Sequence, residues 1–287
     1  MFQSILRFFR SKKSLTADEI LRYPKPRQYT REQHNLRIKD IDPDAVKTVQ
    51  RIQQMGCRAY IVGGSIRDLL LGRKPKDYDI VTDAHPQELR RMFANSRIIG
   101  KRFRLVHVVF KGHKIIEVST ARSLPSNRAA AKNSDELYLK RDNQFGTFKD
   151  DAARRDFTIN ALIFDIKNEA IIDYAGGFED IQNRVVRVIG NPDISFPEDP
   201  VRMYRAVKFA ALLGLDLDAA TYKAIQKYKN LLKKASNARL HEEYNKIFRS
   251  GKTALVFASL NNSGLMETLM PSIQQAEGLH NRLTDEA

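Results

Sequence analysis

The sequence of 287 residues has little or nothing of three features that often define a protein's class: cysteine, long apolar runs and internal repeats. Its one cysteine, Cys57, excludes a disulfide within the chain and indicates a reducing compartment, so we expect a cytoplasmic protein. No apolar run approaches the roughly 18 residues that cross a bilayer, which predicts the absence of a membrane span. The N-terminal MFQSILRFFRSKK carries Arg7 and Arg10 within its apolar stretch, which is not typical of a secretory signal.

Acidic residues are scarce relative to basic ones. The chain has 34 Asp and Glu against 49 Lys and Arg, a formal net charge of +15. Such an excess favours binding to a polyanion, of which nucleic acid is the commonest. The alternative is a basic surface that binds nothing.

The apolar pattern divides the chain into a mixed α/β part and a helical part. Residues 1–40 are basic, and their segment YPKPRQY has two prolines that exclude a regular helix, so we interpret them as an extension. Residues 41–190 predict a head domain of helices and strands, residues 191–250 a helical neck, and residues 251–287 a short helical C-terminal part. The expected strands are residues 59–62, 78–82, 105–110, 115–120, 169–174 and 185–190, with a helix-to-strand passage at 158–166. The expected helices are residues 44–55, 65–72, 202–213, 219–232 and 241–248.

The stretch YIVGGSIRDLLLGRKPKDYDIV, residues 60–81, has two aspartates at the start of a predicted strand. Residues i and i+2 of a strand point to the same face, so Asp77 and Asp79 would project together. Carboxylates this close repel each other unless one is protonated or a cation lies between them. Mg²⁺ suits this position, because it takes one or two carboxylates and leaves coordination positions for phosphate oxygens. Two such ions can activate an attacking hydroxyl and stabilise a leaving pyrophosphate.

A third carboxylate, Glu117, lies between Ile116 and Val118 in the predicted strand IIEVST. The side chains of these neighbours face the other way. Glu117 therefore completes a metal site if its strand lies beside that of Asp77 and Asp79. The alternative is a glutamate on an edge strand that faces water.

Two glycines precede the aspartates. Gly63 and Gly64 follow a predicted strand and open a predicted helix, where free backbone N–H groups form a phosphate cradle. Arg67 lies one turn into that helix and is placed to reach a triphosphate. Two glycines alone most often form only a turn, but the order of glycines, Arg67, Asp77 and Asp79 is far more specific.

Three long segments resemble motifs of the class II nucleotidyltransferases, the family of bacterial poly(A) polymerases and CCA-adding enzymes. They are YIVGGSIRDLLLGRKPKDYDIVT (60–82), ARRDFTINALIFD (153–165) and EDPVRMYRAVKFAALLG (198–214). The resemblance implies a polymerase-β-like α/β head with a small mixed sheet and helices, then an all-helical neck and a truncated helical body. It also implies transfer of a nucleoside monophosphate from a nucleoside triphosphate to an RNA 3′ hydroxyl, with Mg²⁺.

The same resemblance implies roles for individual residues. It implies metal binding by Asp77 and Asp79, phosphate contacts by Gly64 and Arg67, and nucleotide contacts by Arg154, Arg155, Asp156 and Asn160. The residues RRDFTIN alone fit either an anion clamp braced by Asp156 or a helix cap beside two solvated arginines. Whether Asp156 acts in the chemistry or orients the ribose stays open.

The third segment predicts a helix that selects a base. Asp199, Arg202, Arg205 and Lys208 recur every three residues, which places neighbouring members on one side of a helix, and Pro200 fits its first position with Asp199 as the cap. A carboxylate and a guanidinium match the amino donor and ring-nitrogen acceptor of adenine and cytosine, whereas uracil and guanine reverse that order. Asp199 and Arg202 therefore predict a preference for ATP and CTP. The alternative is that Asp199 only caps the helix and the cations are only solvated.

Two further segments bear on the subfamily. IIGKRFRLVHV (98–108) and QHNLRIKDIDPDAV (33–46) resemble the bacterial poly(A) polymerases more than their CCA-adding relatives. We therefore expect addition of AMP from ATP to RNA 3′ ends, with RNA contacts from the basic residues 223–249 or from the N-terminal extension. The alternatives are CCA addition to tRNA from CTP and ATP, and a catalytically silent RNA-binding relative. The sequence does not predict the oligomeric state.

Overall fold

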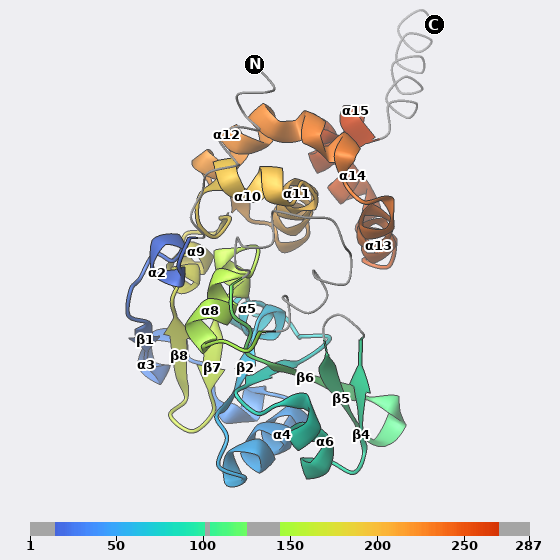
Figure 1. The fold of residues 1–287 in the computed structure, drawn as a ribbon. Helices are drawn as coiled ribbons and strands as arrows, with labels where there is room; N and C mark the ends of the chain where they lie inside the picture. Colours follow the sequence, from blue (N-terminus) through green and yellow to red (C-terminus); the bar gives the residue numbers. More distant parts are fainter. Residues whose placement is uncertain (1–14, 101–103, 125–143, 270–287) are drawn as a thin grey trace, which may run out of the picture. The chain divides into compact units, whose positions relative to one another are not determined.

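The computed structural model describes residues 15–100, 104–124 and 144–269 (Figure 1). The chain packs as two units: Met1–Phe178, here called the head unit, and Glu179–Ala287, the helical unit. Within the described ranges, no helix has both the length and the apolar character needed to cross a membrane.

A mixed sheet forms the centre of the head unit, in the strand order β1-β8-β7-β2-β3-β6-β5-β4 (Figure 1). All neighbouring strands are antiparallel except β3 and β6, which are parallel. The strands are β1 (Arg27–Tyr29), β2 (Ala59–Val62), β3 (Asp79–Thr82), β4 (Ser96–Ile99), β5 (Leu105–Val109), β6 (Ile115–Thr120), β7 (Ile163–Asp165) and β8 (Ala170–Asp173). The expected strands of the head are thus present up to residue 174, whereas β1 and β4 were not predicted.

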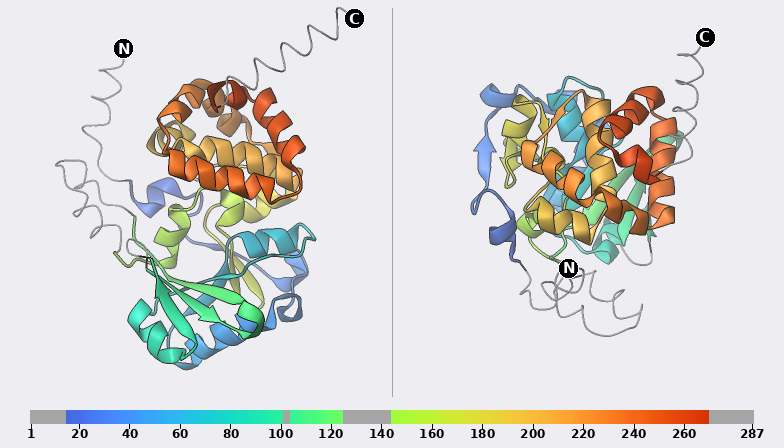
Figure 2. Two further views of the ribbon diagram at one scale, coloured as in Figure 1. Left: turned by 90° about the vertical axis from the view of Figure 1, so that its right-hand side faces the viewer. Right: turned by 90° about the horizontal axis from the view of Figure 1, so that it is seen from above.

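Helices α4 and α6 lie together on one face of this sheet (Figures 1 and 2). Helix α4 begins at Pro43, where the Asp42 carboxylate accepts the backbone N–H of Asp44 at 2.9 Å, and its Val49 and Ile52 are fully buried. The described helices of the head unit are α2 (Ala17–Ile20), α3 (Arg31–His34), α4 (Pro43–Gln54), α5 (Gly64–Leu70), α6 (Pro86–Met92) and α8 (Phe148–Ala153), and the short helix α9 (Gly177–Gln182) spans the boundary between the units. Three single-turn helices, η1 (Ile38–Asp40), η2 (Lys111–His113) and η4 (Thr158–Asn160), complete the head.

The described part of the N-terminal segment belongs to the head unit, which corrects the expectation of a separate extension. Strand β1 pairs with β8 at the edge of the sheet, and Leu21, Tyr23 and Leu36 are buried. His34 is also buried, with Nε2 at 3.1 Å from the Glu169 backbone oxygen. The two prolines that exclude a helix, Pro24 and Pro26, precede β1 and lie outside it.

The helical unit packs around α11 (Val201–Leu213), which contacts α10, α13 and α14. Phe196, Tyr204, Ile225 and Ile247 are fully buried in its core. Its other described elements are α10 (Pro192–Glu198), α12 (Ala219–Tyr228), η5 (Lys229–Lys234), α13 (Asn237–Phe248), α14 (Thr253–Asn262), α15 (Leu265–Leu269) and the two short strands β9 (Val185–Val186) and β10 (Asp216–Leu217). A mixed-sheet head followed by a helical region confirms the predicted fold class.

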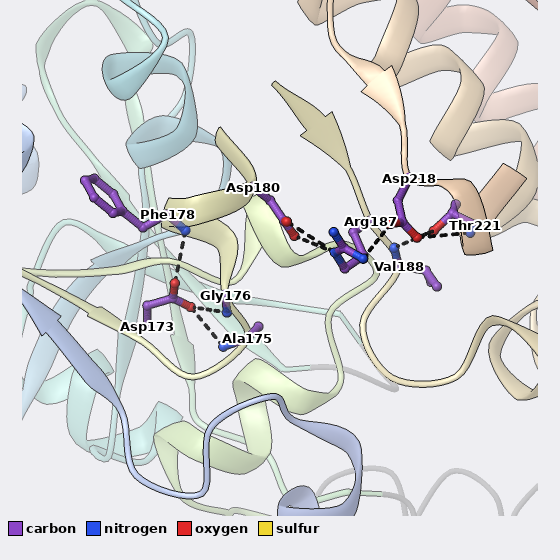
Figure 3. Close-up of polar contacts among 9 residues, drawn as sticks. All are labelled: Asp173, Ala175, Gly176, Phe178, Asp180, Arg187, Val188, Asp218 and Thr221. Atoms are coloured by element: carbon purple, nitrogen blue, oxygen red, sulfur yellow. Dashed lines mark hydrogen bonds and ion pairs between the residues drawn. The ribbon is translucent and has the colours of Figure 1, made fainter. Parts of the chain in front are cut away.

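The boundary between the units falls earlier than the expected residue 190, because β9 pairs with β10 of the helical unit and not with the head sheet. Figure 3 shows how side chains support this pairing: Arg187 lies between Asp180 and Asp218, and the Thr221 backbone N–H donates to Asp218 at 3.2 Å. In the head unit the same figure shows the fully buried Asp173, whose carboxylate accepts backbone N–H groups of the turn that follows β8.

Candidate active site

Asp79 is the first residue of β3 and stands in register with residues on both neighbouring strands. Val62 of β2 pairs with it on one side and Glu117 of β6 on the other, and Glu117 pairs in turn with His107 of β5. Directly paired residues of neighbouring strands point to the same face. Asp79, Glu117 and His107 therefore line one face of the sheet, and Glu117 lies on the strand beside Asp79. Asp77 precedes β3, so the expectation that it projects with Asp79 from one strand is not met.

The electrostatics of Asp79 indicate a surplus of negative charge. Its side chain reaches solvent, but protein atoms crowd its other sides. This partial burial and the charges of Glu117 and Asp77 raise its pKa to about 6, while Arg155 acts in the opposite direction. A cation bound at this point would relieve the repulsion.

His107 is a residue that sequence reasoning missed as part of the site. Its Nε2 lies 3.4 Å from a carboxylate oxygen of Glu117. Within the ranges that the structure describes, no group of three His, Cys, Asp or Glu side chains has the arrangement of a metal site. Metal binding by Asp77, Asp79 and Glu117 together therefore stays a prediction. The alternation in LVHVVF could have placed His107 on one face of its strand, but not beside Glu117.

Gly63 occupies a turn that only glycine fits well. Its φ is +80°, and an added Cβ would lie 2.9 Å from the guanidinium of Arg155 and 3.7 Å from the Asp79 carboxylate. The close approach brings Arg155 beside Asp79. The N–H of Gly63 is not free for a phosphate as expected, because it donates to the backbone oxygen of Leu162 at 3.2 Å. The predicted phosphate contact thus falls to Gly64, the first residue of α5.

Arg67 is buried and already engaged within the head unit. Its Nη1 donates to Asn160 at 2.6 Å and its Nε donates to Asp68 at 2.9 Å. The guanidinium therefore braces α5 against η4. The expected direct contact with a triphosphate stays a prediction.

Asp156 joins the same network through Asn160. The Asn160 Nδ2 donates to Asp156 Oδ1 at 3.0 Å, and the backbone N–H of Phe157 donates to the same oxygen at 2.9 Å. Helix α8 ends at Ala153, and Asp156 lies between α8 and η4, so the choice between an anion clamp and a helix cap stays open. The arrangement fits a residue that orients its neighbours.

The two adjacent arginines have different partners. Arg155 donates to Asp151 at 3.2 Å and to the backbone oxygen of Asn160 at 3.1 Å, which places it in the network of Arg67 and Asp79. Arg154 instead donates to the backbone oxygen of Ser123. The structure thus joins Arg155 to the site, and a nucleotide contact by Arg154 stays a prediction.

In the helical unit, Asp199 and Arg202 form an ion pair with 3.7 Å between Nε and Oδ2. Arg239 of α13, which sequence reasoning missed, holds the same carboxylate with two hydrogen bonds of 2.8 and 2.7 Å. Arg202 also donates to the Ser195 hydroxyl at 2.6 Å. Asp199 is not the cap that the sequence predicted: Pro200 occupies that position, and no side chain caps α11.

The remaining cations of the three-residue series lie elsewhere on α11. The guanidinium of Arg205 lies over the Phe209 ring at 5.6 Å from its centroid. Lys208 is only 3% exposed and pairs with the buried Glu243 of α13. Three helical residues turn the side chain by roughly 300°, so Lys208 has drifted roughly 120° from Arg202. A nucleotide contact by Lys208 requires that its pair with Glu243 open, and it stays a prediction like that of Arg205.

Two family models match the chain. Residues 59–187 match the "Poly A polymerase head domain", and residues 214–277 match the "Probable RNA and SrmB- binding site of polymerase A". The first match contains Gly63, Asp79, Glu117 and Asn160, so it covers the head-unit network described above.

Curated relatives and a solved structure agree with these matches. The chain is 41% identical over 280 residues to poly(A) polymerase I of Salmonella typhimurium, covering 95% of the chain and 60% of that protein. It is 37% identical to the CCA-adding enzyme of Lactobacillus helveticus, covering 74% of the chain and 51% of that enzyme. The crystal structure of the Bacillus stearothermophilus CCA-adding enzyme in complex with CTP superimposes with a TM-score of 0.66 at 34% identity, covering 78% of the chain and 53% of that structure.

The chain thus spans about 60% of the length of the poly(A) polymerases that it matches. The predicted resemblance is confirmed by both family models and by relatives of both subfamilies. With its head sheet and helical unit, the chain belongs to the nucleotidyltransferase family of the bacterial poly(A) polymerases and CCA-adding enzymes.

Proposed function

We propose that the protein is a template-independent RNA nucleotidyltransferase that adds AMP from ATP to RNA 3′ ends. The observation that carries the proposal is the placement of Asp79 beside Glu117 on parallel strands, with Asp77 two residues away, in a head domain of the poly(A) polymerase type. The identity of 41% to a poly(A) polymerase I over most of the chain favours ATP and generic RNA as substrates.

The carboxylates of Asp77 and Asp79 fit a divalent metal ion, and we propose Mg²⁺. Both groups offer hard oxygen ligands. Burial raises the pKa of Asp79, and the charges of Glu117 and Asp77 raise it further, which a bound cation would oppose. When bound, Mg²⁺ would favour the nucleophilic form of the RNA 3′ hydroxyl and stabilise the leaving pyrophosphate. Glu117, held by His107, contributes negative charge beside this pair.

The protein's own residues position the reactants. Arg155, beside Gly63 and Asp79, is placed to contact phosphate oxygens, with Asp151 fixing its orientation. Arg67, Asn160 and Asp156 keep the start of α5 and η4 at a fixed separation. In the helical unit, Asp199 and Arg202 offer the acceptor and donor that match adenine.

Addition of CCA to tRNA is the second candidate function, because the chain is also similar to CCA-adding enzymes and superimposes on one bound to CTP. The pair Asp199 and Arg202 suits cytosine as well as adenine, so it does not choose between the two functions.

One experiment separates these functions. The protein is incubated with Mg²⁺, each labelled nucleoside triphosphate in turn, and either a generic RNA or a tRNA that lacks its terminal CCA. Long A-tails on generic RNA are expected, whereas addition of two C and one A to tRNA alone would replace the first proposal by the second. RNA binding without incorporation would identify a silent RNA-binding relative. Asp77→Ala combined with Asp79→Ala should abolish incorporation and leave RNA binding unchanged.

A further inference from the structure

A cavity of about 770 Å³ opens in the head unit at the point where β3 and β6 begin. Its lining comes from residues 40–42, the end of α5, residues 74–78 and residues 113–116, and it includes Asp77. The volume falls within the range of roughly 300–1,000 Å³ that is typical of small-ligand sites, which is large enough for a nucleotide. The cavity thus shares Asp77 with the proposed metal site, whereas Asp79 and Glu117 do not line it.

The charges around this cavity favour an anionic occupant. The acidic side chains of Asp42 and Asp44 are already paired with Lys114. Lys74 and Lys76 are exposed, and neither forms an ion pair with any part of the chain that the structure describes. With Asp77 assigned to the metal, the lining has Lys74, Lys76 and Lys114 against Asp40 and Asp42, an excess of one positive charge, and Lys74 and Lys76 lie within three residues of Asp77.

The cavity also has an apolar surface. Ile41, Tyr78 and Ile116 are buried in its wall, whereas Ile115 remains 46% exposed at the lining. An exposed isoleucine offers contact area to the face of a base but no hydrogen bond. Such a surface accepts any base, which distinguishes it from the pairing groups of Asp199 and Arg202.

The position of the cavity relative to the phosphate-binding side indicates which substrate enters it. Gly63 follows β2, and Arg155 lies against it, so the groups suited to a triphosphate are on the β2 side of Asp79. The segment 113–116 leads into β6, on the other side of β3. In phosphoryl transfer the attacking and leaving oxygens lie roughly in line. The acceptor strand must therefore approach from the side away from the pyrophosphate.

We infer that this cavity is a subsite for the RNA acceptor strand, in which Lys74 and Lys76 contact backbone phosphates near the 3′ end and Ile115 packs against a base. The subsite rests on the proposed function for its place in the reaction, but its binding of RNA can be measured without catalysis. The subsite does not distinguish one base from another, which agrees with the extension of generic RNA ends.

The test compares two variants of equal charge. Lys74→Gln with Lys76→Gln removes the two cavity cations, and Lys47→Gln with Lys111→Gln removes two exposed lysines outside the lining. Thermal unfolding establishes that both variants are folded. Affinity for a 5′-labelled oligoadenylate is measured by fluorescence anisotropy over a range of salt concentrations, together with KM for ATP.

For the cavity variant we expect about a tenfold weaker Kd for RNA, and a slope of log Kd against log salt that is smaller by about 1.4, or about 0.7 for each lost phosphate contact. KM for ATP should not change, and the control should bind RNA more tightly than the cavity variant. Ile115→Ala should also weaken RNA binding, without a change in the salt slope.

Equal RNA affinity in the cavity variant and the control would overturn the inference. A raised KM for ATP with unaltered RNA binding would do so as well, because it would assign the cavity to the nucleoside triphosphate. If the wild-type protein incorporates no nucleotide, the proposed function fails, whereas the comparison of RNA affinities still decides the subsite.

Discussion

Asp79 in the head unit has an unfavourable electrostatic environment that a bound cation would relieve. Its pKa of about 6 reflects first its partial burial and then the repulsion of two nearby acids, Glu117 and Asp77. In metal-free buffer at pH 8, Asp79→Asn should therefore raise the thermal midpoint of unfolding. Mg²⁺ or Mn²⁺ at about 100 times its Kd should stabilise the wild type by about 2.7 kcal/mol, or about 5–10 °C, and should have little effect on the variant.

The measurement is calorimetric unfolding with and without a chelator. Glu88→Gln, on the exposed surface of α6, is a control that removes one carboxylate away from the acidic face. An equal response of the wild type and Asp79→Asn to the metal would contradict the assignment.

His34 makes the stability of the head depend on pH. Burial lowers its pKa below the ordinary 6.5, and the Glu169 backbone oxygen and the carboxylates of Glu169 and Glu32 oppose only part of this effect. Its Nδ1 accepts the backbone N–H of Leu36 at 3.0 Å, so the folded state favours the neutral ring. The unfolded chain binds a proton as pH falls through 6.5 while the folded chain does not, and the free energy of unfolding should fall.

Urea unfolding at pH 7, 6 and 5 measures this dependence. His34→Gln removes the titrating ring, so the free energy of unfolding of this variant should fall less steeply below pH 7 than that of the wild type. Equal slopes would show that His34 has the same pKa in both states.

At the scale of elements, local sequence signals were sufficient for the segments that carry the head-unit site. Asp42 and Pro43 mark the start of α4, and Gly63 separates β2 from α5. Strands β1 and β4 were missed because three or four residues show little periodicity, and β1 in addition pairs with the distant strand β8. The partners of β9, Asp199 and Lys208 could not be predicted for the same reason, since each comes from another element.

Helix α13 is expected to influence base selection through Arg239. Its two hydrogen bonds fix the orientation of the Asp199 carboxylate, and lysine cannot reproduce this planar geometry. Arg239→Ala should lower kcat/KM for ATP about tenfold and reduce the discrimination against UTP and GTP, and Arg239→Lys should restore only part of it.

Steady-state incorporation with each nucleoside triphosphate measures this effect. Arg51→Ala, an exposed arginine in the last turn of α4, is the matched control. Unchanged discrimination in Arg239→Ala would show that Asp199 keeps its orientation without this partner, or that it does not read the base.

At the scale of the whole molecule, the chain has a net positive charge, and its two units hold different sites. The head unit holds the acidic face and the cavity near it, and the helical unit holds the ion pair Asp199 and Arg202, for which we propose base recognition. The segment 223–249 has eight Lys and Arg against two Asp and Glu, and three of its cations pair with Asp193, Asp199 or Glu243. The segment also contains Lys223, Lys229, Lys233, Lys234 and Arg249, and we expect cations of this segment to contact RNA phosphates.

If about five phosphates are contacted in total, the slope of log K for single-stranded RNA against log salt should be about −3.5, and affinity should fall about 100-fold between 50 and 200 mM salt. Oligoadenylate and oligouridylate should give similar slopes, because phosphate contacts do not read bases. Lys223→Gln with Lys233→Gln should make the slope smaller by about 1.4 in anisotropy titrations. A slope near zero in the wild type would show that the net charge of +15 does not serve RNA binding. A small slope for oligouridylate alone would show instead that base contacts, and not the backbone, dominate the affinity.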